Sequence, residues 1–139
     1  MLKGIPALIS PDLLCILAQM GHGDELVISD AHFPAYSVNP RVIRLDAVSS
    51  PKVMEAILQL IELDQYVEKP VAMMAPVPGD SLNPELQEEC RKILGKNAGR
   101  IDYVERFAFY ERARKAFAVV VSGESRTYGN IILKKGVTF

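Results

Sequence analysis

Three amphipathic segments of the chain each follow a polar residue that is joined directly to a proline. These pairs are Ser10-Pro11, Ser50-Pro51 and Asn83-Pro84. A serine or asparagine side chain accepts a hydrogen bond from a free amide at a helix start, and proline suits the first helical position. Apolar residues then recur at spacings of three and four, the period of one helix face. The pattern predicts helices over about residues 11–20, 51–61 and 84–94, with glycines ending the first and third.

Short aliphatic runs bounded by turn residues lie between and after these helices, a pattern that is typical of buried strands. They are Leu26–Ser29, Val42–Leu45, Val71–Ala75, Ile101–Val104, Ala116–Ser122 and Asn130–Leu133. The run from Ala116 is the most strongly strand-like, because it contains three consecutive valines and a phenylalanine. Residues 106–115 lie between the fourth and fifth runs, and their composition favours a fourth helix.

Strands that alternate with helices predict an α/β fold, in which a parallel or mixed sheet has helices on both faces. The last two strands are joined only by residues 123–129, which are too few for a helical crossover. We therefore expect these two strands to be antiparallel, or to lie apart at the edge of the sheet. No internal repeat or linker interrupts the pattern, so one domain is expected to cover residues 1–139.

The composition is that of a globular protein. The chain has 139 residues, of which 49% are hydrophobic, and such an apolar share suggests that subunit contacts cover some surface. A net charge of −1 offers no basic field to nucleic acid and no polybasic patch to a membrane. No apolar stretch reaches ~18 residues and no signal-peptide core is present, so we expect a cytoplasmic protein. Cys15 and Cys90 fall on apolar faces of predicted helices, which predicts two buried thiols.

Both histidines of the chain flank the first predicted strand. His22 stands between two glycines in the loop that enters the strand, where neighbouring side chains shield its imidazole little. Asp30 and His32 follow the carboxyl end of the strand, where α/β proteins place functional groups. We interpret this segment as the acid/base part of an active site. The alternatives are a surface loop at His22, an Asx turn at Asp30, and a metal site made by both histidines with Asp24 and Asp30.

Two later segments carry groups that suit the recognition of a polyol. The segment from Arg106 to Arg112 combines aromatic rings with cations, which can contact the C–H faces and hydroxyls of a sugar. An amphipathic helix explains the same segment equally well. Tyr128-Gly129-Asn130 would present a hydroxyl and an amide on a tight backbone, although it also suits a simple turn. Asp64 is a further candidate carboxylate that fits equally well as a residue after a helix end.

Four motifs, in order along the chain, resemble the L-fucose mutarotase and D-ribose pyranase (RbsD/FucU) family and span nearly its full length. They are Gly21–Glu25, Asp30–Pro34, Arg106–Ala113 and Tyr128–Leu133, with Lys135–Thr138 at the tail. The ribose branch of this family has a histidine in place of Arg106, and it has Tyr-Ala-Asn in place of Tyr128-Gly129-Asn130. It also differs at residues 31–34. Each difference points to the fucose branch.

The resemblance implies a three-layer α/β/α domain with a mostly parallel sheet, assembled into a decameric ring with sites at subunit contacts. In the family, the Tyr-Gly-Asn segment of one subunit is thought to meet a histidine of its neighbour. Carried onto this sequence, the resemblance implies His22 as the proton donor, with Asp30, Arg106, Tyr128, Gly129 and Asn130 on the sugar. Tyr110 and Asp64 match positions that contact the sugar or assist catalysis in animal members.

The implied reaction is the interconversion of the α and β anomers of a free aldopyranose, most readily L-fucose, by acid/base ring opening and closing. The expected cofactor is none and the expected metal is none, because ring opening needs only proton transfers. Asp30, or a water molecule that it binds, would complement His22 as the proton acceptor. The alternatives are D-ribose pyranase activity, a monosaccharide-binding protein without catalysis, and a ring-forming scaffold without a ligand.

Overall fold

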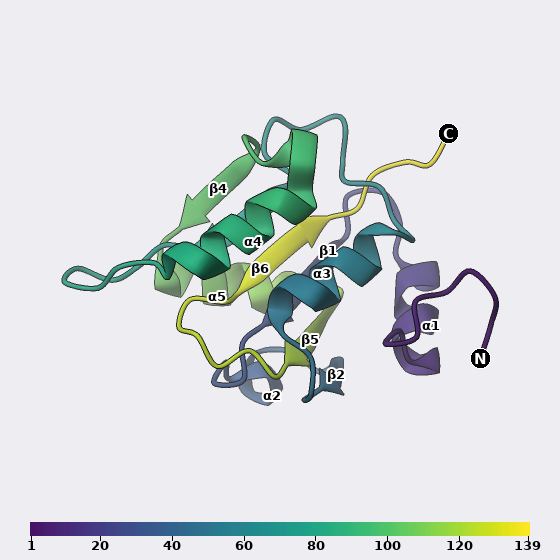
Figure 1. Ribbon diagram of the computed structural model, residues 1–139, viewed down its shortest axis with the longest axis horizontal. Coiled ribbons are helices and arrows are strands. Elements are labelled where there is room, and N and C mark those ends of the chain that lie inside the picture. Colours follow the sequence, from purple (N-terminus) through teal and green to yellow (C-terminus); the bar gives the residue numbers. More distant parts are fainter.

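The computed structural model describes all 139 residues, which form one six-stranded sheet with helices on both sides (Figure 1). The helices are α1 (Pro11–Gln19), α2 (Ala35–Val38), α3 (Ser50–Leu58), α4 (Pro84–Leu94) and α5 (Arg106–Lys115), and a 3-10 turn, η1 (Gly95–Asn97), follows α4. The strands are β1 (Glu25–Ser29), β2 (Val42–Leu45), β3 (Val71–Met74), β4 (Ile101–Val104), β5 (Ala118–Ser122) and β6 (Ile131–Lys134). All six predicted strands and all four predicted helices are therefore present.

Two of the three predicted helix starts are confirmed in atomic detail. The Ser10 hydroxyl accepts a hydrogen bond from the Leu13 amide at 3.2 Å, and Asn83 Oδ1 accepts one from the Leu86 amide at 2.9 Å. The second helix begins one residue earlier than predicted, because Ser49 occupies the cap position. Ser50 is buried inside α3, and its hydroxyl faces Glu124 instead of a helix amide. The short α2 was not predicted, since four residues are too few to show a helical period.

The sheet has the strand order β2-β5-β1-β6-β3-β4, and only β6 runs antiparallel to its neighbours. The predicted mostly parallel, mixed sheet is thus confirmed, and so is the opposite direction of the last two strands. The alternative, that they lie apart at the edge of the sheet, is wrong, because β5 lies between β2 and β1 and β6 lies between β1 and β3. Its residues Ile131, Ile132 and Leu133 are fully buried, as a central strand requires on both faces.

Two apolar cores separate the sheet from its helices. One core joins α1, α3 and α4 to residues such as Leu26 and Ile28, and the other joins α2 and α5 to Val27. Successive side chains of β1 therefore point to opposite faces, as in any strand. Figure 1 shows the three layers, with α3 and α4 in front of the sheet and α2 and α5 behind it. The expected three-layer α/β/α architecture is confirmed.

The two cysteines differ in their surroundings. Cys90 is buried in α4, and that burial raises the pKa of its thiol to about 12. Cys15 is exposed, so the prediction of a second buried thiol is wrong. The reason is that α1 packs against the core through Leu13 and Leu17, four residues apart, while Cys15 lies off that stripe. None of the helices has both the length and the apolar content that a membrane crossing requires.

Candidate active site

A cavity of about 320 Å³ lies at the carboxyl ends of β1 and β3, and its size suits one small ligand. Most of its lining is polar: Asp30, His32, Asp80, Arg106, Tyr110, Thr127, Tyr128 and Asn130. Phe33, Met74 and Val77 add apolar surface. Five residues predicted for the sugar site therefore meet in one place, although they come from widely separated parts of the chain. Gly129 lies between two of them in the sequence.

Asp30 follows the last residue of β1, and only 5% of its surface is exposed. Its amide donates a hydrogen bond to Asn130 Oδ1 at 2.8 Å, and its Oδ1 accepts one from the His32 amide at 3.0 Å. Burial raises the pKa of the Asp30 carboxyl, although hydrogen bonds from the His32 and Gly129 amides oppose the shift. A carboxyl group of raised pKa that borders a cavity can bind and release a proton, as acid/base catalysis requires.

The segment Tyr128–Asn130 has a backbone that few residues could adopt. Tyr128 has φ of +62°, in the left-handed region that bulky side chains rarely occupy. A Cβ added at Gly129 would lie 2.7 Å from Glu124 Cγ, so no larger residue fits there without moving Glu124. Backbone strain of this kind, at a bulky residue, is concentrated at functional sites. The observed geometry favours a binding segment over the turn considered from the sequence.

The Tyr128 hydroxyl is held from two sides. It accepts a hydrogen bond from the Val77 amide at 3.2 Å and donates one to Asp80 Oδ2 at 2.6 Å. The bond to Asp80 raises the pKa of the phenol, which therefore stays protonated at neutral pH. The loop that follows β3 thus fixes the position of the hydroxyl at the cavity.

Arg106 and Tyr110 lie one helical turn apart at the start of α5. Arg106 Nε donates a hydrogen bond to the Tyr110 hydroxyl at 3.0 Å, and the ring of Phe33 packs edge-on against Tyr110. Glu105 caps the helix, with Oε2 accepting from the Phe107 and Ala108 amides at 3.0 Å. The guanidinium group is thereby presented at the mouth of the cavity, where its donors can pair with ligand hydroxyls.

His22 and Asp64 form a separate pair at the other end of the sheet. His22 Nε2 lies 3.0 Å from Asp64 Oδ1, and the ring of Tyr66 lies 5.3 Å away. The His22 side chain is 46% exposed, whereas Asp64 is buried. Burial opposes ionisation of Asp64, but its hydrogen bonds with the Tyr66 amide and the His22 ring hold its pKa below the usual range. The carboxylate therefore orients the imidazole toward solvent.

Within one chain His22 and Asp30 do not face each other, contrary to our interpretation that the segment from His22 to His32 forms the acid/base part of one active site. They flank opposite ends of β1, whose five residues span roughly 13 Å at about 3.3 Å per residue. The metal alternative fails for a related reason. No three His, Cys, Asp or Glu side chains lie close enough together to bind an ion, and the two histidines are at opposite ends of the sheet.

The sequence interpretation missed Asp80 and the apolar part of the cavity wall. Asp80 follows Pro78-Gly79, and Gly79 has φ of +93°, so the sequence did carry a turn signal at this point. A turn signal does not reveal what the turn faces. The contact between Asp80 and Tyr128 joins residues that are 48 positions apart in the chain.

Comparison with known proteins matches residues 3–138 to the RbsD / FucU transport protein family. The chain belongs to the RbsD/FucU family. A relative named L-fucose mutarotase, from Actinobacillus pleuropneumoniae serotype 5b (strain L20), is 56% identical over 99% of this chain and 98% of its own length.

Solved structures extend this comparison. The fucose mutarotase of Streptococcus pneumoniae, in complex with L-fucose, has a TM-score of 0.94 and is 44% identical over 99% of this chain and all of that chain. The superposition with the Bacillus subtilis RbsD complexed with D-ribose covers all of this chain and all of that chain, with a TM-score of 0.81 and 26% identity. This RbsD/FucU protein is thus more similar to the fucose mutarotase than to the ribose-binding relative. The resemblance drawn from its four motifs is confirmed.

Proposed function

We propose that this protein is a mutarotase that interconverts the α and β anomers of L-fucose. The cavity carries the proposal, because it surrounds the buried Asp30 carboxyl, whose pKa is raised, with a guanidinium group, two phenols and an amide. These groups bind hydroxyls from fixed directions, while the apolar wall suits the C–H groups of a sugar. The relatives support L-fucose as the ligand, since one is named L-fucose mutarotase and another is a complex with L-fucose.

The reaction requires two proton transfers. A proton is delivered to the ring oxygen while the anomeric hydroxyl gives up its proton, so that the C1–O5 bond breaks and C1 becomes an aldehyde. Rotation about C1–C2 turns the other aldehyde face toward the C5 hydroxyl, and the two transfers then run in reverse. We assign Asp30, or water that it binds, as the acceptor and His22 as the donor. Each positioned acid or base typically contributes ~10²–10⁴-fold to the rate.

The donor and the acceptor lie too far apart to act within one chain, so we propose that two subunits share each site. Asp64 holds Nε2 of His22 and leaves Nδ1 available to a ligand, and the ring is half exposed. A homo-oligomer, which the family resemblance suggests is a decameric ring, would bring His22 of one subunit to the cavity of the next. We also propose a cytoplasmic location, as the sequence predicts.

Anomer exchange measured by saturation-difference NMR tests this function. Irradiation of one anomeric proton of L-fucose should transfer saturation to the other anomer in the presence of the protein and much less in its absence. Binding of L-fucose without exchange would instead support a monosaccharide-binding protein. Exchange between the pyranose and furanose forms of D-ribose, with none on L-fucose, would support the pyranase alternative.

Substitution Tyr128→Phe should weaken L-fucose binding about fivefold, because one hydrogen bond contributes roughly 1 kcal/mol. Isothermal titration calorimetry measures the change in Kd. Tyr103→Phe is the matched control, since the Tyr103 hydroxyl bonds to Gln87, which does not line the cavity. An unchanged Kd for Tyr128→Phe would show that this hydroxyl makes no contribution to sugar binding.

The pH profile of anomer exchange should follow the ionisation of Asp30. Only the ionised carboxylate accepts a proton, and burial raises the Asp30 pKa. The exchange rate should therefore fall as the pH is lowered through a value above the ordinary aspartate pKa. Rates from NMR across this range, corrected for the exchange in buffer alone, measure the shift. A decline that begins only at the ordinary aspartate pKa would contradict the proton-acceptor role.

A further inference from the structure

One buried carboxylate near the cavity has no part in the proposed mechanism. Glu124 lies in the loop that joins β5 to β6, is 3% exposed, and does not line the cavity. This loop must pass over the carboxyl end of β1, because β1 lies between β5 and β6 in the sheet. Asp30 directly follows that end of β1, so the loop crosses beside the candidate catalytic residue.

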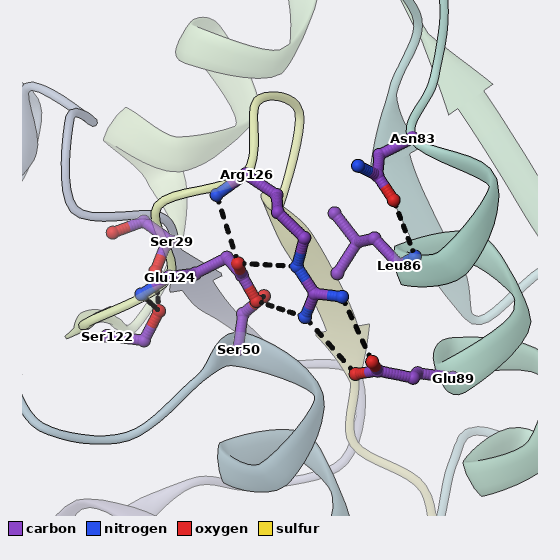
Figure 2. A network of polar contacts seen from close by, with 8 residues as sticks. All are labelled: Ser29, Ser50, Asn83, Leu86, Glu89, Ser122, Glu124 and Arg126. Atoms are coloured by element: carbon purple, nitrogen blue, oxygen red, sulfur yellow. Dashed lines mark hydrogen bonds and ion pairs between the residues drawn. The ribbon is translucent and has the colours of Figure 1, made fainter.

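Arg126 holds the Glu124 carboxylate and links it to α4 (Figure 2). Arg126 Nε and Nη2 donate to the two Glu124 oxygens, both at 2.9 Å, and Nη1 and Nη2 donate to those of Glu89 at 2.9 and 3.2 Å. The Arg126 amide adds a bond to Glu124 Oε2 at 3.0 Å. Burial alone would raise the pKa of Glu124, but Arg126 outweighs that effect and keeps its pKa below the usual range.

Glu124 contacts the residues that follow Asp30 and precede Asn130 in the chain. The Glu124 carbonyl accepts a hydrogen bond from the Ala31 amide at 2.9 Å, one residue beyond Asp30. The Glu124 side chain also packs against Gly129, so closely that a Cβ at position 129 would lie only 2.7 Å from Glu124 Cγ. Ser122 adds a further link between β1 and this loop, since its hydroxyl donates to the Ser29 carbonyl at 2.6 Å and accepts from the Glu124 amide at 3.2 Å.

We infer that Glu124, held by Arg126, which Glu89 fixes in turn, is a positioning residue that keeps the Tyr128–Asn130 segment against Asp30 in the geometry that binds the sugar. This inference rests on the proposed function for its catalytic consequence. A buried ion pair is weak evidence of stabilisation, because apolar residues of similar volume often stabilise a fold equally well. The fixed bidentate geometry instead supplies orientation, which a strained segment beside a reacting group requires.

The first measurement follows the loop without any ligand. In Glu124→Gln the side chain keeps its size and loses its charge, so the bonds from Arg126 weaken. Hydrogen–deuterium exchange of the whole protein should then be faster for amides of residues 123–130 than in the unsubstituted protein. Glu89→Gln, a change at a half-exposed residue, should have the same effect to a smaller extent.

The second measurement follows the sugar. Glu124→Gln should raise both the Kd and the KM for L-fucose about tenfold, because a misplaced segment loses hydrogen bonds to the ligand. A purely structural role would lower the amount of folded protein and leave the KM unchanged. Asn39→Ala controls for lost stability, since Asn39 is buried and bonds to the Ala113 and Ala116 carbonyls at 2.9 Å at the far end of the sheet.

Faster loop exchange together with a raised KM in Glu124→Gln, and an unchanged KM in Asn39→Ala, would support the inference. An unchanged KM in Glu124→Gln, or an equal rise in Asn39→Ala, would overturn it. If Glu124→Gln does not fold, Arg126→Lys decides by the same criteria, because lysine keeps the charge and loses the planar fork. If the unsubstituted protein does not bind L-fucose, the proposed function fails. Hydrogen–deuterium exchange of the amides of residues 123–130 then decides by itself whether Glu124 positions the segment.

Discussion

His22→Ala is expected to lower the rate of α/β exchange of L-fucose by at least about 10²-fold while the cavity still binds the sugar. The reason is that His22 lies outside the cavity of its own chain, so its loss removes a proton donor and leaves the hydroxyl-binding groups in place. Saturation-difference NMR measures the rate, and calorimetry measures the Kd. The Kd should change far less than the rate.

The other histidine of the chain is the natural comparison. His32 lines the cavity and is exposed, and its amide donates to Asp30 Oδ1. This backbone bond survives substitution, so His32→Ala should reduce exchange much less than His22→Ala does. The opposite ranking of the two variants would make His32 the donor and would place a complete site within one chain.

Asp30→Asn should also lower exchange by at least about 10²-fold, since an amide cannot accept the anomeric proton. The substitution keeps the size of the side chain, and the backbone bond from Asp30 to Asn130 does not depend on its charge. Far-ultraviolet circular dichroism and the Kd for L-fucose show whether the fold and the cavity persist. Full exchange activity in Asp30→Asn would remove this carboxylate from the mechanism.

Mixing His22→Ala with Asp30→Asn tests whether two subunits share each site. In co-assembled oligomers, some cavities that retain Asp30 will meet His22 of a neighbouring subunit. Random assembly should make roughly a quarter of the sites complete if each site joins two chains. Exchange activity should therefore rise in the mixture well above that of either variant alone. A mixture that stays inactive after verified co-assembly would contradict the shared site.

The sequence predicted the elements of the fold well where the signal is local. Ser10 and Asn83 bond to amides three residues away, so the cap and the proline together mark the helix starts. Two adjacent serines at positions 49 and 50 left the start of α3 ambiguous by one residue. The position of β6 could not be predicted, because its apolar residues show that both faces are buried and do not show which strands lie beside it.

The candidate site was predictable as a set of residues but not as an arrangement. Asp30 and Asn130 are 100 residues apart in the chain and touch only because β6 pairs with β1. The pairing of His22 with Asp64 spans 42 residues, and nothing near His22 in the sequence indicates it. Motifs identify the chemistry of such groups, whereas strand order decides which end of the sheet each group occupies.

The central place of β6 affects how the chain acquires its structure during synthesis. This last strand is the only link between the β2-β5-β1 half of the sheet and the β3-β4 half. Until β6 is in place, the facing edges of β1 and β3 are therefore unpaired apolar strand edges. Because β6 pairs with β1 next to the Asp30–Asn130 bond and leads into Lys135, which bonds to the His22 loop, removal of residues 131–139 would take away the strand that supports both half-sites.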